Sequence, residues 1–177
     1  MKSLLLVAAA ILLAPSAAAT PVKFGPHAGI YVPMGDYGEM YSLSPEFGGH
    51  ALISLGAVWI EASVSYVPLS KNDDYVGYEL FDDYRASIIP VLLGVRKSFG
   101  VVDFGAGGVL NSFSESAEYG TGGSIDNTDS GGGFYGVLAA GLPAGTVEVE
   151  VALRLETVNF AFLGTEPALS FTVGANF

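Results

Sequence analysis

The sequence predicts an all-β protein, an eight-stranded antiparallel up-and-down transmembrane β-barrel. Three observations indicate this fold class. Apolar and polar residues alternate with a period of two over many segments, which is the period of a β-strand. The connections between these segments alternate between long and short. Half of the 177 residues are hydrophobic and 14% are charged, yet beyond residue 19 no apolar run approaches the roughly 20 residues of a spanning helix.

The first 19 residues are typical of a cleaved signal peptide. Residues 1–3 form a short basic start, residues 4–14 form an apolar run, and residues 17–19 are the small residues that signal peptidase accepts. An N-terminal membrane anchor is the alternative, but the run of 11 residues is short for a span of about 20. We expect export by the general secretory route and a β-barrel domain over residues 20–177.

Eight segments follow the strand period. The alternation is clearest in the last segment, residues 168–177, and residues 146–158 repeat it, with valine and leucine alternating with Glu148, Glu150, Arg154 and Glu156. A strand places these charges on one face, whereas a helix would scatter them around its circumference. The pattern leaves open which way the strands near 47–55, 84–97 and 132–142 face. The predicted strands are 22–34, 47–55, 57–67, 84–97, 100–112, 132–142, 146–158 and 168–177.

The predicted connections carry a second signal. Those at 35–46, 68–83, 113–131 and 159–167 are long and polar and hold 13 of the 18 acidic residues. The links near Gly56, Ser98–Phe99 and 143–145 are tight. Outer-membrane barrels have short turns on the periplasmic side and longer loops outside. The glycines and serines of residues 120–133 further predict a mobile loop.

The polar faces predict a filled lumen. Eight strands leave an interior just wide enough for side chains, and buried charges must be paired there. A soluble barrel of the lipocalin type is the structural alternative, but small residues on the polar faces suit a crowded interior better than a solvated surface. Arg85 or Arg96 joins the interior, depending on how its strand faces. The predicted lumen polar network consists of Lys23, His27, His50, Glu61, Asp103, Glu148, Glu150, Arg154 and Glu156.

Composition excludes several classes of function. Without Lys2 the chain has six basic and 18 acidic residues, which argues against nucleic acid. The absence of cysteine removes disulfides and thiolate metal sites. We expect no metal, cofactor or catalytic residue. His27 and His50 lie on the polar side of adjacent predicted strands, so a metal site or an acid–base pair is the alternative to packing in the lumen.

A family resemblance agrees with these patterns. Residues 172–177, which end in Phe177, and residues 89–96 resemble the small outer-membrane barrels of the OmpX, OmpA-transmembrane-domain and OmpW types, and the porin-like "outer membrane protein beta-barrel domain" group. The resemblance implies a bacterial outer-membrane location and contact with lipid and lipopolysaccharide. It also implies that the barrel-assembly machinery reads Phe177, and we expect a monomer.

Three functions follow from this fold. The first is a structural or surface-interaction barrel with a mostly plugged polar lumen and acidic extracellular loops. The second is a narrow channel for ions or small hydrophobic solutes, for which Leu52, Ile88 and Leu92 are inward-facing candidates. The third is a lipid-modifying enzyme, based on His50 near the outer end of its strand. For this enzyme, Ser42, Ser44 and Glu46 lie in the preceding connection.

Overall fold

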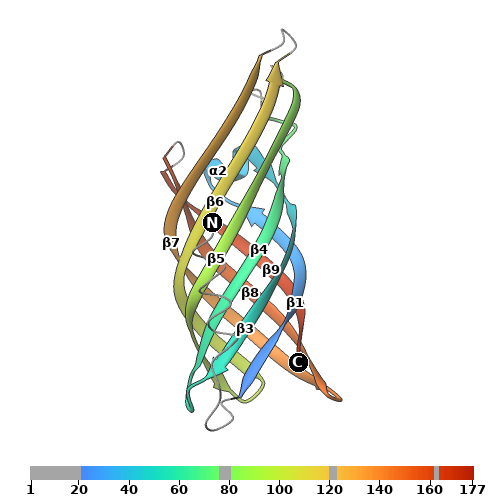
Figure 1. Ribbon diagram of the computed structural model, residues 1–177, viewed down its shortest axis with the longest axis vertical. Helices are drawn as coiled ribbons and strands as arrows, with labels where there is room; N and C mark the ends of the chain where they lie inside the picture. The colour runs from blue at the N-terminus through green and yellow to red at the C-terminus, as the bar shows by residue number, and fades with distance from the viewer. Residues whose placement is uncertain (1–20, 76–80, 120–122, 162–163) are drawn as a thin grey trace.

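The computed structural model describes residues 21–75, 81–119, 123–161 and 164–177. Within them, eight long antiparallel strands form a closed barrel (Figure 1). The predicted signal peptide lies outside the described residues. The long strands are β1 (Val22–Pro33), β3 (Ser44–Ser54), β4 (Trp59–Lys71), β5 (Phe81–Phe99), β6 (Val102–Tyr119), β7 (Ser124–Ala144), β8 (Val147–Phe160) and β9 (Gly164–Asn176).

Each long strand pairs with its neighbours in the chain, and the barrel closes between its first and last strands. β1 pairs with β9 from His27–Gly174 to Pro33–Ala168. This closure leaves no unpaired edge over the part of the described barrel where all eight strands lie side by side, which is the condition for a sheet in hydrocarbon. The predicted up-and-down topology is confirmed. Among the described residues, no helix is long and apolar enough to cross a membrane, a finding that does not bear on strands.

Three tight turns define one end of the barrel, which we call the turn end. They lie between β3 and β4, between β5 and β6, and between β7 and β8, and they contain Gly56, Gly100 and Gly145. All three glycines have positive φ, a conformation that L-residues with a Cβ rarely adopt. The short links predicted from the sequence are therefore confirmed.

The opposite end, the loop end, differs from the prediction. The strands continue far into the segments predicted to be long connections, and β5, β6 and β7 rise above the other strands (Figure 1). Residues 124–133 are part of β7, so the predicted mobile loop over 120–133 is wrong for them. Each of these residues is paired with β6, from Glu118–Ser124 to Val109–Gly133. The regular ladder satisfies their backbone groups, and this pairing outweighs the turn preference of glycine and serine.

A short segment after β1 folds back over the loop end. It contains the helix α2 (Asp36–Met40) and the strand β2 (Tyr41–Ser42), which pairs with Lys71 and Ser70 of β4. The predicted connection 35–46 is therefore shorter than expected, because β3 already begins at Ser44.

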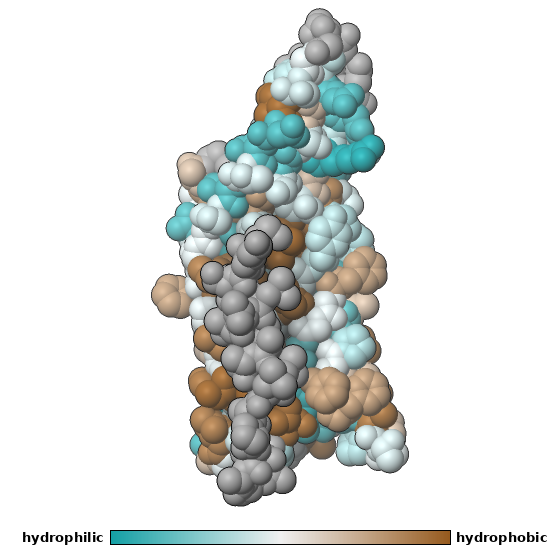
Figure 2. Space-filling view, viewed as in Figure 1, coloured by the Kyte–Doolittle hydropathy of each residue, from teal (hydrophilic) through white to brown (hydrophobic). Residues whose placement is uncertain are grey.

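The strand faces alternate as the period of two predicts. Outward positions form an exposed apolar belt, and the space-filling view shows hydrophobic residues over the lower part of the molecule and hydrophilic residues on the projecting part (Figure 2). The strand facings that the sequence left open are now determined. His50, Leu52 and Arg96 point inward and are buried, whereas Arg85 points outward and pairs with Asp83.

The β1–β9 seam depends on a glycine. A Cβ on Gly29 would overlap the carbonyl oxygen of Phe171 in β9, whereas a Cβ on Gly136 would have only the oxygen of Gly105 nearby, at 4.0 Å. We predict that Gly29→Ala lowers the free energy of unfolding by about 2 kcal/mol or more, because overpacking forces the backbone to shift. Urea unfolding in detergent micelles, followed by the fluorescence of the single Trp59, measures this change.

Gly136→Ala is the matched control and should change the free energy of unfolding by well under 1 kcal/mol, the usual range for surface substitutions. Equal effects of the two variants would contradict the view that close backbone approach at the seam explains Gly29.

Candidate functional site

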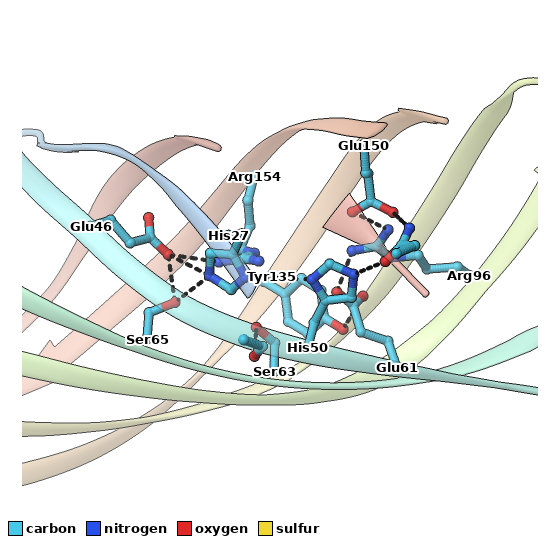
Figure 3. Close-up of polar contacts among 12 residues, drawn as sticks. His27, Glu46, His50, Glu61, Ser63, Ser65, Arg96, Tyr135, Glu150 and Arg154 are labelled. Carbon is cyan, nitrogen blue, oxygen red and sulfur yellow. Dashed lines mark hydrogen bonds and ion pairs between the residues drawn. The ribbon is translucent and has the colours of Figure 1, made fainter. Parts of the chain in front are cut away.

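Inward-facing polar residues from seven strands, β1, β3, β4, β5, β7, β8 and β9, form one connected cluster in the lumen, here called the lumen network. Figure 3 shows its central part. Seven of the nine residues predicted for the polar lumen are joined in it by hydrogen bonds or ion pairs. These seven are Lys23, His27, His50, Glu61, Glu148, Glu150 and Arg154.

Arg96 links three strands of the network. Its Nη2 donates to Oε1 of Glu61 in β4 at 2.5 Å, and its Nη1 donates to Oε1 of Glu150 in β8 at 3.0 Å. Tyr135 of β7 donates its hydroxyl to the other oxygen of Glu61 at 2.9 Å. Arg96 is 1% exposed and Glu61 is fully buried. A guanidinium held between two carboxylates in this way crosses the lumen rather than following one strand.

Glu46 is the second centre of the network, and the prediction misplaced it. The sequence predicted Glu46 to lie in a connection, but it is a fully buried residue of β3. Its Oε1 accepts from Ser65 at 2.6 Å and from Arg154 at 3.3 Å, and its Oε2 accepts from Ser170. His27 places Nε2 at 3.7 Å from Oε1. Side chains from several strands therefore meet at one carboxylate.

Lys23 and Glu148 lie closer to the turn end. Nζ of Lys23 is 2.8 Å from Oε2 of Glu148, and it also sits over the ring of Trp59 at 5.2 Å from the centroid. The amide nitrogen of Asn176 donates to Glu148 at 3.0 Å and to Glu150 at 3.3 Å. Asn176 thereby connects the turn-end ion pair to the Arg96 cluster.

The two histidines join the Glu46 and Arg96 centres. Nδ1 of His50 lies 3.4 Å from Nδ1 of His27. Nε2 of His50 is 2.5 Å from Oδ1 of Asn176, and Nε2 of His27 is 2.9 Å from Oγ of Ser65. Both residues are buried. The prediction that they could be neighbours is confirmed.

Two predicted residues lie outside the network. Glu156 is 1% exposed, but within the described part of the chain neither carboxylate oxygen has a hydrogen-bond partner. Asp103 is half-buried near the turn end of β6, and in the described residues it makes no ion pair. The sequence pattern correctly placed both on the inner face, but it carries no information on which inner-face residues meet.

Above the network an aromatic cluster, here called the cap, fills the loop end. Tyr37 of α2 packs against Tyr41 and Phe160, with ring centroids 5.3 and 6.2 Å away, and Phe113 lies 5.2 Å from Phe160. Tyr31 of β1 completes the cluster, and all five side chains are at most 1% exposed. Sequence reasoning missed the cap, because Tyr37 and Tyr41 fall in a predicted connection and reach the lumen only when that segment folds inward.

Among the described lumen residues, no serine hydroxyl donates to a histidine that could act as its base. Ser65 lies beside His27, but its hydroxyl proton is donated to Glu46, so His27 does not act as its base. His50 is not at the loop end of its strand, as the enzyme hypothesis required. It is the seventh of the 11 residues of β3, counted from the loop end, and it pairs with Gly25 near the start of β1. In the described residues, no cluster of three or more His, Asp or Glu could hold a metal ion.

Phe177 lies at the turn end beside the first strand. Its amide donates to the carbonyl of Phe24 at 3.0 Å, and its ring is 6.4 Å from that of Phe24, with 57% of the residue exposed. Its role as an assembly signal stays a prediction.

No family model matches the sequence, and no curated protein matches it either. Solved structures do match. Neisserial surface protein A has a TM-score of 0.61 at 11% identity over 88% of this chain and 95% of its own. Ail, the attachment invasion locus protein of Yersinia pestis, has a TM-score of 0.60 at 9% identity over 88% and 96%. A major outer membrane protein from Thermus thermophilus has a TM-score of 0.57 at 12% identity over 88% and 98%.

This chain has the fold of the small outer-membrane β-barrels. Identities of 9–12% support a shared fold and nothing finer. The predicted resemblance to eight-stranded barrels of the OmpX type is confirmed at that level.

The ion pairs of Arg96 predict a large contribution to the free energy of unfolding. We predict that Arg96→Met lowers the free energy of unfolding by about 3–5 kcal/mol, because two buried carboxylates lose their cation. Arg85→Met is the matched control, since the side chain of Arg85 is 79% exposed and pairs only with Asp83 among the described residues, and it should cost less than about 1 kcal/mol.

Urea unfolding in micelles measures both variants. If Arg96→Met were as mild as Arg85→Met, the lumen charges would be screened by water and the described pairing would not matter for stability.

Proposed function

We propose that the protein is an integral barrel of the bacterial outer membrane, with a closed lumen and a surface-interaction role at its loop end. In this proposal it is exported by the secretory route and assembled by machinery that reads Phe177. It lies as a monomer among lipid and lipopolysaccharide. The apolar belt supports this location, because the outward residues of β1, β3 and β5 to β9 include exposed leucine, valine and phenylalanine side chains.

The packing of the interior supports a closed lumen. The network and the cap lie one above the other, and their central residues Arg96, Glu61, Glu46, Tyr37 and Phe113 are all at most 1% exposed. Moving an ion along this route would require breaking buried ion pairs and displacing the cap. The function is therefore expected on the exterior, and the most distinctive exterior feature is the projecting part of β5, β6 and β7.

This projecting sheet consists of residues 81–86, 112–119 and 124–133, and it is the observation that carries the proposal. Its described side chains include five carboxylates and a single arginine, Arg85. The carboxylates are Asp83, Glu115, Glu118, Asp126 and Asp129. A surface with this charge attracts a basic partner and repels an acidic one.

The projecting sheet also has open edges. Pairing of β4 with β5 ends at Leu69–Ala86, and pairing of β7 with β8 ends at Tyr135–Glu156. β8 still lies against β7 as far as Asp129, whose Oδ2 accepts from the amide of Ala161 at 2.8 Å. From Ala86 towards Phe81 in β5, and from Asp129 towards Ser124 in β7, the outer side forms no ladder with another described strand. Unpaired edges bind extended segments by strand addition. We therefore infer that the partner is a basic, extended segment of another protein.

One structural neighbour suggests a control ligand for binding. Ail has been solved in complex with the heparin analogue sucrose octasulfate, which is a polyanion. The acidic projecting sheet of this protein is unsuited to such a ligand, so a polyanion serves as the negative control for binding.

The two alternative functions have less support. Two candidates for an apolar channel lining are buried against other side chains. Ile88 packs against the cap, and Leu92 packs with Val109 and Tyr135. The enzyme hypothesis relied on His50 at the outer end of its strand, where it does not lie. We therefore propose a non-enzymatic role.

We predict that the refolded barrel binds a lysine-rich extended peptide, and that Glu118→Gln/Asp126→Asn weakens binding at least fivefold by removing two carboxylates from the projecting sheet. Fluorescence anisotropy at low and physiological salt measures the dissociation constants. Binding should weaken with salt, as exposed charge pairs are screened.

Asp36→Asn/Glu39→Gln is the matched control, because it removes the same charge from exposed positions of α2. Equal weakening of peptide binding by both variants would mean that the net charge of the protein, and not the projecting sheet, determines binding. A failure of the wild-type barrel to bind the basic peptide would contradict the proposed function.

A further inference from the structure

His27 of β1 and His50 of β3 contact each other inside the barrel. Their Nδ1 atoms are 3.4 Å apart and their ring centroids are 5.7 Å apart. The centroids are thus only 2.3 Å farther apart than the nitrogens, about the sum of two ring radii. The two nitrogens therefore face each other head on (Figure 3).

The tautomer of His50 follows from Asn176. The amide nitrogen of Asn176 lies 3.0 Å from Glu148 Oε1 and 3.3 Å from Glu150 Oε2. A carboxylate only accepts, so this atom must be the NH₂ group, and the amide oxygen must face His50. Nε2 of His50, 2.5 Å from that oxygen, must therefore carry a proton.

The tautomer of His27 follows from Ser65 in the same way. The hydroxyl of Ser65 has one proton and donates it to Glu46 Oε1 at 2.6 Å. Oγ of Ser65 must then accept the hydrogen bond from Nε2 of His27, 2.9 Å away. His27 therefore also carries a proton on Nε2.

If both rings were neutral, each Nδ1 would be a bare lone pair, and the two lone pairs would point at each other inside a closed lumen. We propose that His27 and His50 form a proton-binding site, in which His27 is an imidazolium that donates its Nδ1–H to Nδ1 of a neutral His50. One bound proton turns a repulsive contact into a hydrogen bond.

The surroundings explain why His27 carries the charge. Glu46, on the neighbouring strand β3, places its carboxylate 3.7 Å from Nε2 of His27. Arg154 of β8 donates to Oε1 of the same carboxylate at 3.3 Å, and the other two donors to Glu46, Ser65 and Ser170, are neutral. His50 faces the Arg96 guanidinium of β5 as well as Glu150 of β8, so a positive charge on His50 would be opposed from one side.

The charge balance of the network leads to the same conclusion. The residues joined by hydrogen bonds or ion pairs include four carboxylates and three permanent cations. The carboxylates are Glu46, Glu61, Glu148 and Glu150, and the cations are Lys23, Arg96 and Arg154. Tyr135 of β7 donates to Glu61 and adds no charge. A protonated His27 supplies the fourth positive charge.

The proposed site links the stability of the barrel to pH. Unfolded histidines have a pKa near 6.5, so where the pair keeps its shared proton above that pH, the folded barrel holds one proton more than the unfolded chain. By linkage, the free energy of unfolding then falls as pH rises. This contribution is greatest at about pH 6.5 and is lost as the folded site releases its proton. Below about pH 6.5 the unfolded chain protonates both histidines while the folded pair holds one proton, so the contribution falls again.

The direct test is ¹⁵N NMR of the histidine rings in the micelle-refolded wild-type barrel, which reports the protonation of each nitrogen. We expect at pH 6.5 one ring protonated on both nitrogens, assigned to His27 by its absence in His27→Gln. The other ring should be protonated on Nε2 alone. Two neutral rings at this pH, or a doubly protonated His50, would overturn the proposal.

The second test is the pH dependence of urea unfolding between pH 6.5 and 8.5. One bound proton gives up to a tenfold change in the unfolding equilibrium constant per pH unit. His27→Gln and His50→Gln should each remove this dependence. Ser63→Ala is the matched control, because Ser63 pairs with His50 and is buried, but its hydroxyl donates to the carbonyl of Gly49 rather than to either ring. A dependence that persists in both histidine variants would also overturn the proposal.

Discussion

The structure depends on one constraint, the pairing of charges buried inside a barrel of eight strands. Closing eight strands brings inner-face side chains from opposite walls into contact. Arg96 meets Glu61 and Glu150 from two other strands, and Glu46 collects donors from β4, β8 and β9. A buried carboxylate without its cation is costly, so these contacts fix which strands lie opposite each other and at what height. Register, closure and the position of the histidine pair all follow from that arrangement.

The outer and inner faces of the same strands meet different environments. Along β8, leucine and valine face outward while Glu148, Glu150, Arg154 and Glu156 face inward. The apolar belt satisfies a hydrocarbon environment, and the network satisfies the interior. Neither face offers a polar surface for recognition at mid-height. In the proposed function the polar, acidic projecting sheet, which lies beyond the belt, binds the partner, because it combines exposed carboxylates with open strand edges.

Sequence periodicity accounts for the fold class and for most strand facings, because a period of two is a local property that survives without knowledge of partners. It accounts less well for the site. Arg96 lies in a segment with branched apolar residues on both faces, so the sequence does not show whether its side chain points inward or outward. The pairing of β5 with β4 and β6 determines that it points inward. Glu46 follows Ser44 and Pro45, which resemble a turn, and was assigned to a connection.

The misjudged elements share a physical cause. The cap forms only when α2 brings Tyr37 over the barrel, and β7 continues through glycines and serines because β6 pairs with it. Both depend on contacts between residues far apart in the chain. The hydrogen bonds that set the histidine tautomers are of the same kind, since Asn176 is 126 residues from His50. Local patterns place these side chains on the inner face but do not show which of them meet.

We infer above all that paired charges and the cap close the lumen. Planar-bilayer recording of the refolded protein tests this inference most directly, with Glu148→Gln/Glu150→Gln alongside. We expect no steady single-channel conductance for the wild type. We expect brief openings in the variant, in which Lys23 and Arg96 lose carboxylate partners. A steady wild-type conductance whose ion selectivity changes in the variant would contradict this inference and make the lumen a transport pathway.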